Sequence, residues 1–301
     1  MPDLIKLSIN SRGFTIMEVM LSSFLGLVVL SVSFGSLISN RGIFRFDLQR
    51  SAMNQNLRGS LDFVGTMVRE AGENLPSNVP AVEIIDGNTN PDQMILRRNL
   101  IDQVLKVCQE IESGSATNRI YFALNGSPDT GCIRANNLSI YDAWRSYRLA
   151  HGGTVKAFLY NIVTHEGEFV DYSSETDTGA DLYIQKDSGT FLYDYPVNAA
   201  AVYIIEEWHF RIGSYLGQPN YLQVIENGDM DNILNVMFGI QEFNVTAILQ
   251  DNTTQSSFDR TNNWKLLRGI RIRLGAQTQT KLKNVSSQLE AEYFPRNILS
   301  D

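Results

Sequence analysis

The acidic residue Glu18 stands at the start of a segment in which an ionised side chain is costly. From Val19 to Asn40 the sequence contains no charged residue, and this run is long enough to cross a hydrocarbon core of about 30 Å as a helix. A carboxylate near the bilayer costs about 2.5 to 3.5 kcal/mol on insertion scales and usually has a partner. We therefore expect Glu18 to have a specific partner.

The two cysteines, Cys108 and Cys132, are separated by a modest loop. In a chain that carries a membrane-targeting segment, such a pair predicts a disulfide. Closing the loop would stabilise the fold by about 3 to 4 kcal/mol on the chain-entropy model. The alternative is two unpaired buried thiols. The pair is a poor zinc site, because no histidine lies near it in the sequence.

The other residues able to carry chemistry form no catalytic or metal-binding motif. The sequence lacks a phosphate-binding loop, a nucleophile elbow and the zinc-protease helix motif. The three histidines are isolated from one another and are expected on the surface or in the core: His151, His165 and His209. We therefore predict no catalytic residue, no cofactor and no metal ligand, and that the chain is not an enzyme.

Two acidic stretches are expected to have structural roles and not to bind calcium or act in catalysis. Residues 86–92 alternate acids and amides like the start of a calcium-binding loop, but Pro91 replaces the turn glycine and Arg97 replaces the terminal bidentate acid. Glu206 and Glu207 are adjacent in a β-rich stretch. Such a pair is expected at a solvated strand edge and only rarely forms a catalytic pair.

Length and composition indicate a folded protein. The chain has 301 residues, of which 43% are hydrophobic, so it can bury a sizeable core. Its formal net charge of −8 argues against general nucleic-acid binding, because neutralising phosphates requires clustered Lys and Arg.

The element that positions Glu18 is a long helix, predicted from Phe14 to about Ala71 and ended by Gly72 and Pro76. Residues 14–40 form its membrane-spanning half, and residues 41–75 form an amphipathic half that should pack on a domain. The predicted buried face has apolar residues spaced by three or four: Met53, Leu57, Leu61, Val64 and Val68.

The sequence predicts a β-rich domain over residues 76–301, with β-forming segments separated by polar loops. The expected strands cover residues 81–85, 93–96, 119–124, 156–164, 182–185, 201–212, 236–249 and 264–274. We predict an α+β fold in which the amphipathic helix packs on an antiparallel sheet.

The N-terminal motif resembles the type III signal of prepilins. Residues 11–19, SRGFTIMEV, follow a short polar leader and place a glycine, an aromatic residue and an acid at the start of the apolar run. The resemblance implies that residues 1–13 are a leader removed by a prepilin peptidase after Gly13, and that Phe14 becomes the methylated first residue. It also implies that Glu18 neutralises the N-terminal amine of a neighbouring subunit during assembly.

Later segments narrow the resemblance to PilW-type minor pilins of the type IV pilin-like proteins. They are residues 61–63 and 69–72 at the helix end, the late segment WKLLRGIRIRL at 264–274, and YFPRN at 293–297. The resemblance implies a subunit that initiates type IV pilus assembly at or near the tip. It also implies a single inner-membrane span with a periplasmic domain before the subunit reaches the pilus and cell surface. The implied partners are other minor and major pilins and the inner-membrane assembly platform.

Two other functions remain open. The J-type pseudopilins of type II secretion share much of this layout, so the chain could belong to a short periplasmic pseudopilus. Alternatively, it is a membrane-anchored periplasmic binding module, with residues 77 to 301 holding a ligand. The gene neighbourhood would distinguish the first alternative, and ligand-dependent thermal stabilisation would support the second.

Overall fold

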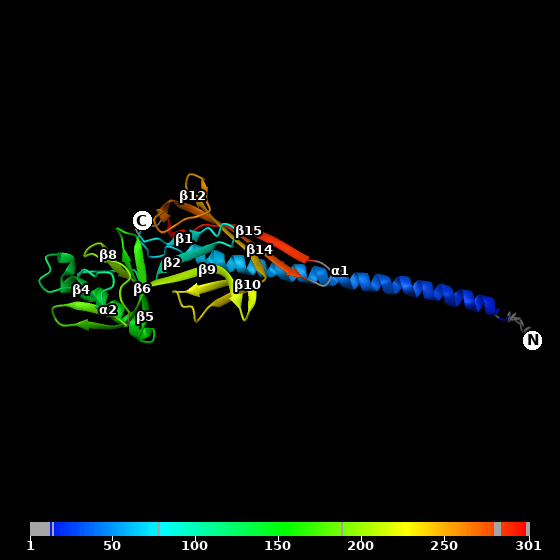
Figure 1. Ribbon diagram of the computed structural model, residues 1–301, viewed down its shortest axis with the longest axis horizontal. Coiled ribbons are helices and arrows are strands. Elements are labelled where there is room, and N and C mark those ends of the chain that lie inside the picture. The colour runs from blue at the N-terminus through cyan, green and yellow to red at the C-terminus, as the bar shows by residue number, and fades with distance from the viewer. Residues whose placement is uncertain (1–12, 14, 77–78, 188, 280–283, 299–301) are drawn as a thin grey trace, which may run out of the picture. The chain divides into compact units, whose positions relative to one another are not determined.

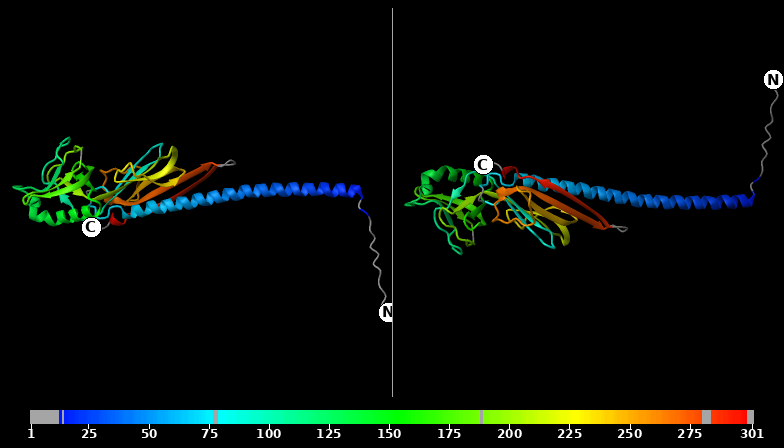
Figure 2. Two further views of the ribbon diagram at one scale, coloured as in Figure 1. Left: turned by 90° about the horizontal axis from the view of Figure 1, so that it is seen from below. Right: turned by 90° about the horizontal axis from the view of Figure 1, so that it is seen from above.

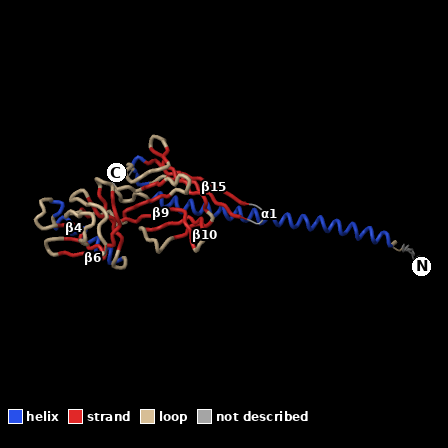
Figure 3. The backbone as a smooth tube through the Cα atoms, viewed as in Figure 1, coloured by secondary structure: helices blue, strands red, loops and turns tan. Residues whose placement is uncertain are grey.

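The computed structural model describes residues 13, 15–76, 79–187, 189–279 and 284–298, and it has the expected α+β fold (Figure 1). Figure 3 shows one long helix followed by many strands joined by loops. Two compact units are present, residues 1–52 and residues 53–301. The boundary falls inside the range 41–75 that the sequence predicts as amphipathic.

Helix α1 runs without interruption from Ile16 to Glu70. The apolar stripe predicted from the sequence is confirmed, since all five of its residues from Met53 to Val68 are at most 7% exposed. The helix ends before Gly72, which has φ +81° and whose N–H donates to the Arg97 carbonyl at 2.8 Å. A side chain at Gly72 would also collide with the Trp264 ring, so both conformation and space require glycine there.

A five-stranded sheet and a four-stranded sheet pack with residues 53–70 of α1, and we call this assembly the body. Every ladder in both sheets is antiparallel. The five-stranded sheet has the order β1 (Val82–Ile85), β2 (Gln93–Asn99), β9 (Ile205–Tyr215), β10 (Gln218–Glu226), β11 (Leu234–Phe238). The four-stranded sheet has the order β13 (Thr254–Gln255), β12 (Ile240–Leu249), β14 (Leu267–Gln279), β15 (Asn284–Tyr293).

Contacts from α1 reach both sheets of the body. Phe63 meets Phe210 of β9 edge to face, with ring centroids 6.3 Å apart. On another side of the helix, the Arg69 guanidinium lies over the Tyr293 ring of β15. In the four-stranded sheet the apolar residues of β14 are fully buried: Leu267, Ile270, Ile272 and Leu274. The helix is therefore a central core element of the body.

A six-stranded antiparallel sheet is inserted between β2 and β9, and with α2 it forms what we call the inserted lobe, residues 101–204. Figure 1 draws this lobe in green, and Figure 2 shows α2 (Arg134–Ala150) against one face of its sheet. The order is β3 (Leu105–Lys106), β8 (Ala200–Tyr203), β5 (Val155–Asn161), β6 (Glu166–Asp177), β7 (Leu182–Lys186), β4 (Arg119–Ala123).

Three sequence expectations about the strands were wrong. The segment 201–212 is two strands that part at Ile204, because β8 belongs to the inserted lobe and β9 to the body. The segment 236–249 is interrupted at Gly239, which has φ +82°. Residues Trp264–Leu266 form a 3₁₀ turn, so β14 begins only at Leu267.

Helix α2 was not anticipated. Its buried residues Asn137, Tyr141, Trp144 and Arg148 follow helical spacing, but polar and aromatic types conceal the pattern. Trp144 is fully buried and its indole N–H donates to the Gln103 carbonyl at 3.1 Å. Short 3₁₀ turns also occur at Thr130–Cys132 and Arg296–Ile298.

Candidate functional site

The N-terminal segment is held by a reciprocal cap between Thr15 and Glu18. The Glu18 carboxylate accepts hydrogen bonds from the Thr15 backbone N–H at 2.9 Å and from its hydroxyl at 3.0 Å. The Glu18 N–H lies 3.3 Å from the Thr15 hydroxyl oxygen. This is the capping-box arrangement, which satisfies N–H groups that a helix start leaves unpaired. Among the described residues, the hydrogen-bond partner of the Glu18 carboxylate is therefore Thr15.

Gly13 is exposed, and a Cβ added to it would meet no atom within 4 Å. Contacts with the described residues therefore give no steric reason for glycine at that position. The predicted cleavage and methylation residue Phe14 lies outside the described residues.

The first part of α1 is long and apolar enough to cross a membrane. An 18-residue window of the helix has a mean hydropathy of 2.0 and none of it is buried within the chain. Large apolar residues here are exposed, from Ile16 (82%) through Phe34 (61%) to Leu48 (53%). The Ser31 and Ser33 hydroxyls donate to carbonyls one turn earlier, so their polar groups are satisfied inside the helix.

The predicted disulfide between Cys108 and Cys132 is present. It joins the segment after β3 to the 3₁₀ turn before α2, so both ends lie within the inserted lobe. Among the described residues there is no free cysteine. The two cysteines are 24 residues apart in sequence, and a cross-link that closes a loop of this size contributes about 3.5 kcal/mol on the chain-entropy model.

The three histidines lie in separate environments. His151 stacks on Tyr147, and His165 Nδ1 lies 3.0 Å from the Tyr160 hydroxyl. His209 Nε2 lies 2.7 Å from the Gln93 side-chain oxygen, and burial, together with the charges of Arg211 and Arg97, lowers its pKa. No group of three or more metal-ligating side chains occurs in the part of the chain that the structure describes.

The calcium-like stretch 86–92 is a turn held by its own carboxylates. Asp86 accepts from the Asn88 N–H at 2.7 Å. Asp92 is 8% exposed; one of its oxygens accepts from Gly87 and the other from Val245 of β12. These oxygens connect the loop before β2 to the other sheet of the body, so the stretch has a structural role.

Glu206 and Glu207 are not at a solvated strand edge, which corrects the sequence expectation. They lie in β9, an interior strand, directly opposite Arg98 and Arg97 of β2. Arg97 Nε is 2.6 Å from Glu207, and its Nη1 is 2.9 Å from Glu83. The sequence carried no sign of these ion pairs, because more than 100 residues separate β2 from β9.

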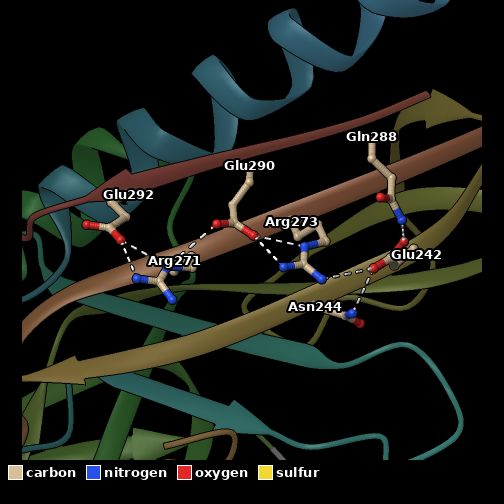
Figure 4. A network of polar contacts seen from close by, with 7 residues as sticks. All are labelled: Glu242, Asn244, Arg271, Arg273, Gln288, Glu290 and Glu292. Carbon is tan, nitrogen blue, oxygen red and sulfur yellow. Dashed lines mark hydrogen bonds and ion pairs between the residues drawn. The ribbon is translucent and has the colours of Figure 1, made fainter. Parts of the chain in front are cut away.

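The arginines of β14 form a ladder of ion pairs on the outer face of the four-stranded sheet (Figure 4). Arg271 lies opposite Glu292 and Arg273 lies opposite Glu290 in the register of β14 and β15. The closest N–O distances are 2.6 Å and 2.7 Å. Glu242 of β12 extends the ladder toward Gln288. Such exposed pairs are worth up to about 1 kcal/mol each and favour one register.

The comparisons with known proteins give no relative for this chain. No protein-family model matches it, and no curated protein and no solved structure matches it. The fold and the chemistry of the residues therefore have to carry any functional proposal. What they establish is a long N-terminal helix, apolar enough in its first part to span a membrane, that continues into an antiparallel β domain.

Proposed function

We propose that this chain is a PilW-type minor pilin that helps to initiate a type IV pilus at or near its tip. In this proposal a prepilin peptidase removes residues 1–13, and the new N-terminus at Phe14 is methylated. The precursor spans the inner membrane once, with its β domain in the periplasm, and the mature subunit then enters the pilus. The protein acts by assembly and catalyses no reaction.

The observation that carries the proposal is that the two parts of helix α1 have different surroundings. Its first part exposes large apolar side chains, whereas from Met53 to Val68 the same uninterrupted helix buries a stripe in the body. A plain membrane anchor needs only about 20 apolar residues and no continuation into the folded domain. A filament subunit requires both parts, because one packs against neighbouring helices and the other holds the β domain.

Glu18 fits the assembly step through its charge. An acid at the start of an apolar helix is costly in lipid unless it is paired. The cap to Thr15 satisfies hydrogen bonds but does not neutralise the carboxylate. An amine at the N-terminus of a neighbouring pilin, major or minor, would supply the missing charge while the assembly platform adds the subunit.

The test is N-terminal mass spectrometry of the protein purified from its native membrane, with and without the prepilin peptidase of the cell. We expect a peptide that begins at methylated Phe14 and depends on the peptidase. An intact leader in both samples would refute the filament proposal. The amount of mature protein in sheared surface pili then separates a pilus subunit from a pseudopilus subunit, which would stay with the cells.

A further inference from the structure

An open groove of about 610 Å³ runs between helix α1 and strand β11 of the body. Its walls are five residues of the helix between Gln55 and Phe63 and all five residues of β11, Leu234–Phe238. None of these residues is charged, although 19% of the residues in the whole chain are. Such a groove offers no counter-charge to an ionic ligand, so the chemistry of its walls fits an uncharged occupant.

Strand β11 forms an open edge of the five-stranded sheet. Among the described strands it pairs with β10 alone, so the N–H and C=O groups of its other side point out of the sheet. The opposite edge of the same sheet is covered, because Ile84 of β1 exchanges both backbone hydrogen bonds with Phe258, at 2.7 and 2.9 Å. β11 also contains neither a charged residue nor a proline, two devices that keep sheet edges from pairing.

Both faces of the sheet are apolar at this edge. Leu234 is 54% exposed and lies opposite Val224, whose other partner Phe210 packs on α1, so Leu234 belongs to the face on the helix side. Phe238 is 56% exposed and lies opposite Tyr221, with ring centroids 5.0 Å apart. Tyr221 precedes Val224 by three residues in β10, which puts Phe238 on the other face. A strand added to β11 would therefore bury apolar surface on both faces.

The helix side of the groove leaves room for a main chain. Gly59 lines the groove, and a Cβ added to it would meet no atom within 4 Å. The next residue, Ser60, donates its hydroxyl to Met237 Sδ at 3.3 Å and so ties the helix to β11. A strand beside β11 would lie about 4.8 Å from it. The missing side chain at Gly59 lets such a strand pass over the helix.

We propose that β11 accepts an edge strand of a different pilin subunit, and that this strand is uncharged and apolar on both faces. Its main chain would continue the five-stranded sheet, and its side chains on one face would enter the groove beside Leu234. In such an addition the main-chain hydrogen bonds give affinity and the side chains give specificity. The inference rests on the proposed function, because filament assembly is what brings the subunits together.

The sheet edges of this chain itself do not fit that description. β15 carries Glu290 and Glu292, β1 is covered by Phe258, and β3 and β13 have two residues each. In β4, the Tyr121 carbonyl already accepts a hydrogen bond from the Cys108 N–H. Two copies of β11 could pair only across a two-fold axis, whereas the contacts of a helical filament join unlike surfaces. The partner strand therefore belongs to another protein.

Site-specific photo-cross-linking in the cells that make the pilus tests this docking. The photoreactive residue p-benzoyl-phenylalanine is placed in the full chain at Leu234, and at Leu216 as the control, since Leu216 is 83% exposed but does not line the groove. We expect the probe at 234 to form a covalent product with another pilin, and mass spectrometry to map its attachment site to an uncharged strand. The probe at 216 should not form this product.

Three results would overturn the docking: no product from position 234, equal yields from both positions, or a product with a second copy of this chain. The N-terminal peptide is read in the same samples. If it begins at methylated Phe14 while the cross-link is absent, the docking is wrong and the pilin proposal stands. If the leader is intact, the pilin proposal itself fails.

A variant that fills the groove locates the contact. Gly59→Phe should lower the yield of the product from position 234 about tenfold or more, because its ring occupies the space of the added strand. Arg58→Phe is the matched control, since Arg58 is a neighbouring exposed residue of α1 that does not line the groove. Equal yields in the two variants would show that the partner strand does not enter the groove.

Discussion

Arg97 and Arg98 are neighbours in β2, and the pleat of the strand directs their side chains to opposite faces of the sheet. Each meets two or more carboxylates, but the environments differ. The Arg97 side chain is 8% exposed between Glu83 and Glu207, whereas the Arg98 side chain is 24% exposed and reaches Glu70 at the end of α1. We therefore expect the degree of burial to determine how much each arginine contributes to the free energy of unfolding.

Replacing these two arginines should separate buried from exposed pairing. Arg97→Ala leaves two carboxylates buried without a counter-charge and should lower the free energy of unfolding by about 3 to 5 kcal/mol. Arg98→Ala, the control, should lower it by about 1 kcal/mol because water reaches its partners. Urea unfolding of the full chain in micelles measures both. Equal losses would contradict the role given to burial.

Glu18 has two candidate roles, which substitutions can distinguish. Glu18→Gln can keep the cap on Thr15 but loses the charge. If the charge acts in assembly, as proposed, this variant should be cleaved normally and enter filaments as poorly as Glu18→Ala. Immunoblots of sheared pili and of membranes measure incorporation and cleavage.

The control for this experiment is Thr15→Ala, which removes the hydroxyl of the cap and keeps the carboxylate. It should enter filaments almost as well as the unchanged protein. Normal incorporation of Glu18→Gln together with poor incorporation of Thr15→Ala would show that capping is the function of this pair. The role of Glu18 in neutralising an amine would then be wrong.

At the scale of elements, the fit of α1 into the body depends on a small residue facing β15. A Cβ built on Gly65 would lie 2.1 Å from the Tyr293 ring, whereas one on Gly59 would meet nothing within 4 Å. Both glycines lie within the helix. Helical periodicity alone does not tell them apart, because the difference arises from a tyrosine more than 200 residues away.

The two glycines should respond in opposite ways to alanine. Gly65→Ala forces α1 away from Tyr293 and should cost about 1 to 3 kcal/mol of stability, as overpacking does. Gly59→Ala should stabilise the protein by about 0.5 to 1 kcal/mol, because alanine loses less conformational entropy in a helix. Thermal unfolding of both variants by circular dichroism checks the signs, and stabilisation by Gly65→Ala would contradict this packing.

The whole molecule is a body interrupted by a lobe with its own core. The buried core of the lobe is made of residues between Leu105 and Ile204, and its disulfide is internal. The chain leaves β2 at Asn99 and returns to β9 at Ile205, and these two residues are partners in one antiparallel ladder. The pairing of β2 with β9 in the body is therefore continuous up to the point where the lobe is inserted.

This topology predicts that the lobe can be removed. Replacing residues 101–203 by the turn Asn-Gly should join β2 and β9 as an ordinary hairpin and leave a body that unfolds cooperatively. Replacing 100–203 by the same turn is the control, because it shifts the register of one strand and exposes its buried face. If the first variant is as unfolded as the second by near-ultraviolet circular dichroism, the lobe is not separable.

Local sequence signals determined the parts of this fold that depend on short-range periodicity. The apolar run, the buried stripe from Met53 to Val68 and the alternation of β14 follow from spacing within one element. The chain has only two cysteines, so their pairing was the single possible intramolecular disulfide. The α+β class follows from the same patterns, since a long periodic helix precedes many short β-forming segments.

Tertiary structure alone decided which strands share a sheet and which charges meet. Ile204 separates two sheets within what reads as one strand, and the partners of Arg97 come from β1 and β9. A hollow of about 210 Å³ is likewise lined by His165 from the lobe and Arg260 from the body. Contacts between residues so distant in sequence depend on how whole sheets pack together. The free energy of that packing cannot be predicted from a short segment of sequence.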